Sequence, residues 1–424
     1  MYIELITKPV KRMLFLSKSS VLLKYTLSFF LLMLINLCLP LSIANATVIV
    51  TGTTKGVKYH PGHYLNPTGL KKSVDGYIMK ETYKEMSSSP VFKGIELQLK
   101  WAEVENDDGT LNTSFLDAHL AKLNSYPIKR RLIIFLNTKT INLTEKLVPA
   151  YLTNTLHPDY KSAYQGGIYA WGNEVDGTNP KVHKGNATKL WIPEVRDRLI
   201  NVMEKLGAKY NAHPLFDGIG LNETAMGMAL TGTTLAQENA FYQSLLDIQK
   251  KMKLAFPNTM TFQYTNYPNR ILSSFIMGST NSLKSIGVAL GGPDVWLNDP
   301  GVNFKGTNYV PPGVYHYYPL LSGVLPLSPA VMSGNYRCSR ADCNNTQGNF
   351  DPTARQLLDY ARDKLQANYI FWMRDTALNK SRIPNYKEME TMLKNLYSSL
   401  NSADRDAVKL DERCPSMYAP CIID

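Results

Sequence analysis

The stretch "RRLIIFLN", residues 130–137, is the clearest indication of the fold in the sequence. Two arginines are followed by five consecutive apolar residues and an asparagine. A strand that is apolar on both faces is typical of a parallel sheet covered by helices, whereas a strand with one face in water alternates apolar and polar residues. This stretch therefore predicts a buried parallel strand, and its neighbours in the sequence should supply the covering helices.

On both sides of this stretch, apolar runs of strand length alternate with amphipathic patterns of helix length. "FKGIELQLKW" (92–101) alternates, with Ile95, Leu97 and Leu99 on one side. The other predicted strands are 56–60, 130–137, 216–223, 259–266, 285–292, 325–333 and 368–375. The predicted helices are 77–86, 114–126, 192–211, 234–256, 269–282, 352–366 and 386–400.

Eight strands, nearly all followed by helices, predict an α/β protein with one closed (β/α)8 TIM barrel over residues 47–424. The polar segments 138–190 and 293–313 would be long loops after strands 3 and 6. A doubly wound open sheet is the alternative. It would favour a glycine-rich phosphate loop after the first strand, and "HPGHYLNP" (60–67) does not have that pattern.

Residues 1–46 have the pattern of a signal peptide. Basic residues precede the apolar run "TLSFFLLMLINLCLPLSI" (26–43), and "ANA" (44–46) resembles a cleavage site. We expect cleavage after Ala46 and a periplasmic or secreted protein. The alternative is an uncleaved anchor, since the run is near the minimum length for a membrane span. Contact with a membrane is expected only through this segment.

The net charge of the chain is +11. After residue 46, however, we find no Lys/Arg run of the kind that binds nucleic acid, so no nucleic-acid partner is expected. A generally basic surface is the simpler interpretation, and affinity for acidic glycans is the alternative. We expect a monomer that needs no cofactor.

Four cysteines follow residue 46 in two close pairs, Cys338 with Cys343 and Cys414 with Cys421. In an exported protein this pattern predicts two small disulfides. Zinc is the alternative, but the spacings match no common finger and no histidine is nearby, so no metal is expected.

The carboxyl ends of barrel strands carry the active sites of TIM-barrel enzymes. In this sequence the predicted strands end in carboxylates, amides and tryptophans, which suit hydroxyl-rich sugar rings. The candidates for substrate binding are His60, Lys100, Trp101, Trp171, Asn222, Asn266, Trp296 and Trp372. The candidate catalytic acids are Glu223, Asp294 and Asp375, with Glu96 deeper in a strand.

Two segments resemble the clan A (β/α)8 glycoside hydrolases. In residues 94–137 a strand ends in Trp101, and an acid, a glycine turn and "LD" opening a helix follow. Residues 204–223 are similar to the third helix and fourth strand of that family, which ends in Asn-Glu. The resemblance implies that Glu223 is the general acid/base, that Asn222 positions the sugar, and that Trp372 is the tryptophan at the end of strand 8.

One feature departs from the family pattern. The family's nucleophile is a Glu at the end of strand 7, but no Glu occurs between His316 and Gln366. The second carboxylate would have to be Asp294, Asp375 or Glu96. The sequence thus predicts an exported protein that hydrolyses O-glycosidic bonds of a polysaccharide or oligosaccharide, and the alternative is a catalytically inactive barrel that binds glycan. Glu223 as a plain strand-end acid, and Asp294 as a turn residue, stay open as simpler interpretations.

Overall fold

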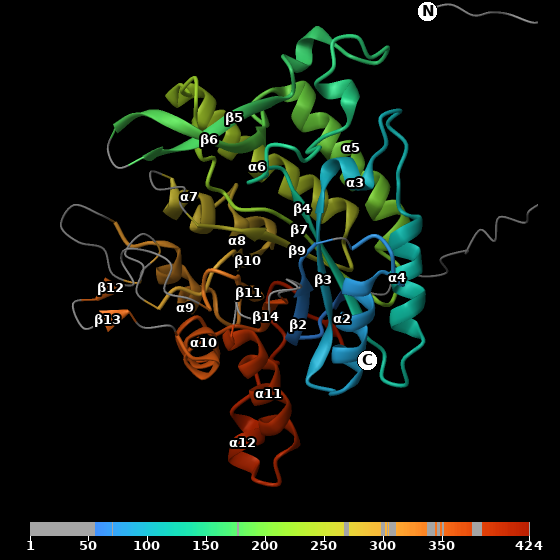
Figure 1. Ribbon diagram of the computed structural model, residues 1–424, viewed down its shortest axis with the longest axis vertical. Helices are drawn as coiled ribbons and strands as arrows, with labels where there is room; N and C mark the ends of the chain where they lie inside the picture. Colours follow the sequence, from blue (N-terminus) through green and yellow to red (C-terminus); the bar gives the residue numbers. More distant parts are fainter. Residues whose placement is uncertain are drawn as a thin grey trace, which may run out of the picture. The chain divides into compact units, whose positions relative to one another are not determined.

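Eight parallel strands close into a barrel in the computed structural model (Figure 1). The structure describes residues 56–69, 71–175, 178–266, 271–297, 302, 304, 311–336, 344–345, 348–349, 352–374 and 384–423. They belong to one unit, Thr53–Asp424. The predicted signal peptide, Cys338, Cys343 and Asp375 lie outside the described residues.

The barrel strands follow the chain order, and the last strand pairs with the first. They are β2 (Gly62–Pro67), β3 (Phe92–Lys100), β4 (Arg131–Asn137), β7 (Phe216–Leu221), β9 (Met260–Tyr264), β10 (Ala289–Gly292), β11 (Leu327–Val331) and β14 (Tyr369–Arg374). All eight pairings are parallel. The predicted (β/α)8 fold is therefore confirmed.

Helices of different lengths connect the strands. They are α2 (Tyr77–Ser87), α3 (Trp101–Val104), α4 (Ser114–Asn124), α5 (Pro193–Tyr210), α6 (Leu235–Ala255), α7 (Leu272–Met277), α8 (Leu283–Ile286), α9 (Tyr317–Leu321), α10 (Ala354–Asp359), α11 (Pro384–Ser398) and α12 (Ser402–Asp406). Short turns are η1 (Ala150–Leu152), η2 (Ser162–Tyr164), η3 (Val314–His316) and the π-helical η5 (Tyr360–Lys364). None of the described helices has the length and apolar character needed to cross a membrane.

The first barrel strand is not the predicted one. Residues 57–58 form β1 (Val57–Lys58), which pairs with β15 (Cys421–Ile422) outside the barrel. The barrel strand begins at Gly62, after Pro61, which has no backbone N–H to give to a strand ladder. Alternation alone misses β2 because this strand buries His63 and Asn66.

The loop after the third barrel strand holds structure of its own. β5 (Ile168–Val175) pairs with β6 (Thr178–Thr188) and with β8 (Met228–Ala229) in an antiparallel sheet. Figure 1 shows the β5–β6 hairpin at the top, beyond the carboxyl ends of the strands. Two further short strands, β12 (Asn344–Asn345) and β13 (Gly348–Asn349), pair with each other.

Aromatic side chains fill the barrel. Phe135, Phe262, Tyr264 and Phe371 contact one another from β4, β9 and β14. The glycine in the middle of β7 makes room for them, because a Cβ at Gly220 would lie 2.3 Å from the Phe262 ring. The apolar interior thus closes the barrel and forms a floor beneath its carboxyl end.

Candidate functional site

A cavity of about 530 Å³ opens at the carboxyl end of the barrel. That volume is within the usual range for small-molecule sites, roughly 300–1,000 Å³. It is lined by Thr68, Gly69, Lys71, Gln98, Lys100, Glu103, Phe135, Asn137, Lys139, Thr140, Ile141, Glu145, Asn222, Glu223, Tyr264, Pro293 and Met332. The lining therefore combines an apolar floor with amides, three lysines and three glutamates.

Glu223 is held from two sides. Its Oε1 accepts a hydrogen bond from Nζ of Lys139 at 2.6 Å, and its Oε2 accepts one from Nδ2 of Asn266 at 2.5 Å. The orientation of the Asn266 amide is fixed, because its Oδ1 accepts from the backbone N–H of Ala225 at 2.9 Å. The Glu223 side chain is still 29% exposed. The carboxylate is thus fixed in place and open to the cavity.

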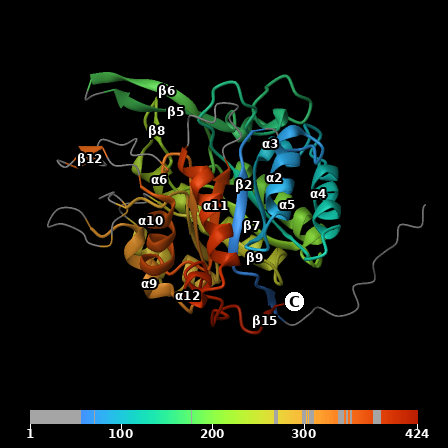
Figure 2. The same cartoon turned by 60° about the horizontal axis from the view of Figure 1, so that its bottom comes forward.

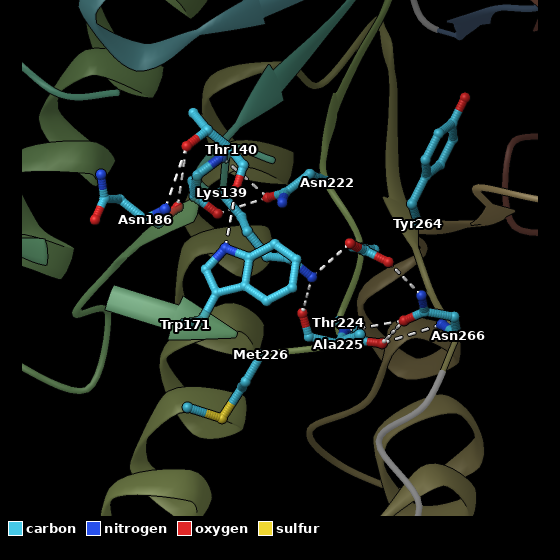
Figure 3. Close-up of polar contacts among 12 residues, drawn as sticks. Lys139, Thr140, Trp171, Asn186, Asn222, Thr224, Ala225, Met226, Tyr264 and Asn266 are labelled. Carbon is cyan, nitrogen blue, oxygen red and sulfur yellow. Dashed lines mark hydrogen bonds and ion pairs between the residues drawn. The ribbon is translucent and has the colours of Figure 1, made fainter. Parts of the chain in front are cut away.

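Lys139 is the centre of this arrangement, as Figure 3 shows. Its Nζ also donates to the carbonyl of Ala225 at 2.8 Å and lies 4.5 Å from the centroid of the Trp171 ring. Trp171 comes from β5, is buried, and donates from Nε1 to the carbonyl of Thr140 at 2.9 Å. Trp171 therefore positions a cation, by charge–ring attraction and packing, and does not offer an open ring face.

Among the described residues, the side-chain amide oxygen of Asn222 has hydrogen-bond partners and the amide nitrogen has none. Its Oδ1 accepts from the backbone N–H of Thr138 at 3.1 Å and from the hydroxyl of the same residue at 2.5 Å. Within the described residues its Nδ2 group makes no hydrogen bond, and the side chain lines the cavity. A donor fixed in this way is suited to a ligand hydroxyl or carbonyl oxygen.

Glu96 lies under the cavity floor and is fully buried. It is bonded to the hydroxyl of Tyr264 at 2.7 Å and to Nδ2 of Asn66 at 2.6 Å. Burial raises the pKa of Glu96 to about 8, against the opposing effects of Tyr264, Lys71 and Asn66. The raised pKa favours the protonated form of Glu96 at neutral pH, and Tyr264 stands between Glu96 and the cavity.

Two further lysines face the cavity. Burial lowers the pKa of Lys71 to about 8, with nearby acids acting in the opposite direction. Lys100, a predicted substrate-binding residue, lies 3.5 Å from a carboxylate oxygen of Glu145 and 3.8 Å from one of Glu103. Positive and negative groups are thus interleaved around the opening.

The structure brings together five of the residues that the sequence predicts for the site. Asn222, Glu223 and Lys100 line the cavity, while Asn266 and Trp171 hold Glu223 directly or through Lys139. Trp171 lies at the same end of the barrel as Glu223, as expected of a residue in the loop after strand 3.

Trp101 and Trp372, which the sequence predicts to bind substrate, do not line this cavity. Trp372 faces outward from β14, because its neighbour Phe371 points into the barrel and side chains alternate. It is fully buried and donates to Nδ1 of His63 at 3.0 Å. Trp101 is also buried and donates from Nε1 to Glu105 at 2.6 Å.

His60 lies at the opposite end of the barrel. It precedes β2 instead of ending a strand, and its Nδ1 is 2.8 Å from Oδ1 of the buried Asp217. His60 therefore does not line the cavity that holds Glu223, because the first strand begins later than the sequence suggests.

Asp294 and Trp296, the candidates in the segment after β10, do not line the cavity. Oδ1 of Asp294 accepts from Nδ2 of Asn335 at 3.0 Å, and Trp296 is buried. Among the described residues of this segment, Pro293 alone lines the cavity. Of the predicted disulfides, Cys414–Cys421 is present.

Sequence reasoning missed Lys139, Lys71 and Tyr264. Lys139 comes two residues after the end of β4, at a position typical of catalytic groups in a barrel, and that position is a usable signal. Lys71 lies in a loop after a strand that the sequence misplaced, so no signal pointed to it. Tyr264 is the last residue of β9, where the sequence drew attention to the amide that follows.

No protein-family model matches the chain, and no curated protein matches it. Among solved structures, a beta-galactosidase of Marinomonas ef1 is 11% identical, with a TM-score of 0.46 over 83% of this chain and 62% of that one. A GH36 alpha-galactosidase of Geobacillus stearothermophilus, in complex with 1-deoxygalactonojirimycin, is 9% identical, with a TM-score of 0.36 over 80% of this chain and 43% of that one. An alpha-galactosidase of Lactobacillus brevis is 10% identical, with a TM-score of 0.37 over 80% and 40%. This chain thus spans 40% to 62% of the length of these three enzymes, and its assignment as a TIM barrel rests on the strand pairing described above.

Proposed function

We propose that the cavity binds an oligosaccharide or polysaccharide and that Glu223 takes part in hydrolysing one of its O-glycosidic bonds. The observation that carries this proposal is that two side chains donate hydrogen bonds to the carboxylate of Glu223. Lys139 follows β4 and Asn266 follows β9, and both donate to a carboxylate that is still 29% exposed to the cavity. A side chain fixed from two other strand ends is typical of a positioned reactive group.

The rest of the lining suits a sugar. The amides of Gln98, Asn137 and Asn222 can bond hydroxyl groups, and the rings of Phe135 and Tyr264 offer apolar surface to the face of a sugar ring. The proposed ligand is therefore a hydroxyl-rich ring with an apolar face.

The hydrogen bonds favour particular roles for Glu223. Both of its carboxylate oxygens accept hydrogen bonds, so neither has a proton to donate in this arrangement. An ionised carboxylate can activate water or stabilise an oxocarbenium ion. The role of proton donor, expected from the resemblance, requires Lys139 to move away when the substrate binds.

A hydrolase also needs a second group. Among the described residues, the other carboxyl groups that line the cavity are Glu103 and Glu145, both near Lys100. The described residues that end β11 and follow it, 331–336, contain no acid. This absence favours the second candidate function, which is a barrel that binds glycan without cleaving it.

The test is a polysaccharide screen of the protein without residues 1–46, followed by Glu223→Gln. General acid–base catalysis supplies about 10²–10⁴-fold, so hydrolysis should fall by that factor while binding changes only a few-fold. Glu194→Gln, an exposed change at the start of α5, is the control and should keep full activity. Equal hydrolysis by wild type and Glu223→Gln would contradict a catalytic role. Binding without cleavage by wild type would establish the second candidate, and the absence of both would reject the carbohydrate proposal.

A further inference from the structure

A second cavity, of about 490 Å³, lies at the amino end of the barrel. Its basic side chains come from the starts of two neighbouring strands: Lys93 from β3, and Lys129, Arg130 and Arg131 from the entry to β4. His60 lies at its edge, before β2. We call these five residues the basic cluster. Figure 2 shows β15, whose following residue Ile423 lines this cavity, at the bottom, away from the β5–β6 hairpin.

His60 of the cluster lies 2.8 Å from Asp217, but three of the other four side chains have no acidic partner among the described residues. Within the part of the chain that the structure describes, Lys93, Lys129 and Arg130 form no ion pair. Glu412 is the one carboxylate among the described residues that line this cavity. Cations that gather in a cavity without matching acids create a positive potential that attracts anions.

Arg130, one of the two arginines of the cluster, is buried at a cost. Arg130 is 4% exposed, and it donates only to backbone carbonyls, those of Phe92, Met86 and Ser89. Its Nε has no hydrogen-bond partner. Burial also lowers the pKa of Arg130. An anion in the cavity would compensate this buried charge.

The remaining lining indicates what the anion is attached to. Pro61, Pro90, Ile128, Tyr397 and Ile423 give the cavity an apolar side, and Ile128 and Ile423 are exposed by 57% and 65%. Lysine ammonium and arginine guanidinium groups are the usual partners of phosphate oxygens. The cavity therefore suits a phosphate group joined to an apolar moiety.

We propose that the cavity of the basic cluster binds a phosphate ester, with the phosphate on Lys93 and Lys129 and the apolar moiety against Ile128 and Tyr397. This site is separate from the Glu223 cavity, so the proposal does not depend on carbohydrate hydrolysis. Two sources share this chemistry: a soluble phosphate ester and the headgroup of an anionic lipid.

The test measures binding of phenyl phosphate by calorimetry, with phenol as the uncharged comparison. Wild type should bind phenyl phosphate but not phenol. Lys93→Ala with Lys129→Ala should bind about a hundredfold more weakly, about tenfold for each charge-assisted hydrogen bond lost. Lys250→Ala with Lys251→Ala, two exposed changes on α6, remove the same charge elsewhere and should leave binding unchanged. Circular dichroism and the midpoint of thermal unfolding check that the double variants fold.

A second arm distinguishes the sources. Cosedimentation with phosphatidylglycerol vesicles, and not with phosphatidylcholine vesicles, would support the lipid headgroup if the cluster variant loses it. Binding of phenyl phosphate without cosedimentation would support the soluble ester. The proposal is overturned if wild type binds neither probe, or if the cluster variant binds as well as wild type.

Discussion

The ammonium group of Lys139 lies 2.6 Å from Oε1 of Glu223, and the two residues follow different strands of the barrel. Lys139 is 9% exposed and Glu223 29%. The pair therefore joins a mostly buried cation to a carboxylate that reaches the cavity. A carboxylate fixed in this way can accept hydrogen bonds from a ligand without first changing its position.

A double-mutant cycle measures this coupling without any substrate. Lys139→Met keeps the bulk of the side chain beside Trp171 and removes the charge, and Glu223→Gln removes the other charge. We expect a coupling of about 1 kcal/mol in urea unfolding, because the pair is partly buried. The pair of Lys209 and Asp117, which are 41% and 48% exposed, is the control. It should give a coupling near zero, and equal couplings in the two cycles would contradict the prediction.

Trp372 should matter for stability and not for the cavity. Trp372→Phe removes the donor to the buried Nδ1 of His63 and leaves a small void. We expect the free energy of unfolding to fall by about 2–3 kcal/mol, and binding of any glycan found in the screen to stay within a few-fold. Asn222→Ala, at the cavity, is the comparison and should weaken binding. A larger loss of binding in Trp372→Phe than in Asn222→Ala would restore the role that the sequence suggested.

Part of the fold and of the candidate site could be predicted from the sequence, and part could not. The barrel could be predicted, and so could the position of Asn222, Glu223 and Asn266 at its carboxyl end. A strand end is a local pattern, and every parallel strand of a barrel ends on the same face. The direction of Trp372 could not be predicted, since one residue of register decides whether a side chain points inward or outward. His60 was predicted at the end of the first strand, although it precedes β2. The strand β2 was missed because it buries polar side chains, so its sequence does not alternate between apolar and polar residues. The contact of Lys139 with Glu223 joins residues 84 positions apart, which no local pattern shows.

The disulfide Cys414–Cys421 should stabilise the end of the chain. It closes a short loop that ends at β15, the partner of β1. Replacing both cysteines with serine should lower the free energy of unfolding by about 2 kcal/mol, from the loop entropy regained by the unfolded chain. Thiol titration of the denatured, unreduced protein checks that these cysteines are oxidised, and the same count tests whether Cys338 and Cys343 are oxidised too. No free thiol is expected in the protein cleaved after Ala46, and two would mean that one pair is reduced.

Glu96 should make the folded protein less stable as the pH rises. Burial raises its pKa from the ordinary value of 4.5 to about 8. Between these values the folded state keeps a proton that the unfolded state has lost, so stability falls as the pH increases. The slope for one such group is about 1.4 kcal/mol per pH unit.

The window from pH 6.5 to 8 isolates this effect. The pKa of the buried His63 is lowered from 6.5 to about 4, so its opposite contribution, a loss of stability as the pH falls, is confined to that lower range. The pKa values of Lys71 and Lys253 are lowered to about 8, so their contributions arise above that pH. Urea unfolding at several pH values between 6.5 and 8 should therefore show stability falling in wild type. Glu96→Gln, which keeps the shape and cannot ionise, should show a flatter dependence. An equal slope in both proteins would mean that Glu96 is ionised in the folded state, and the floor of the cavity would then carry a negative charge.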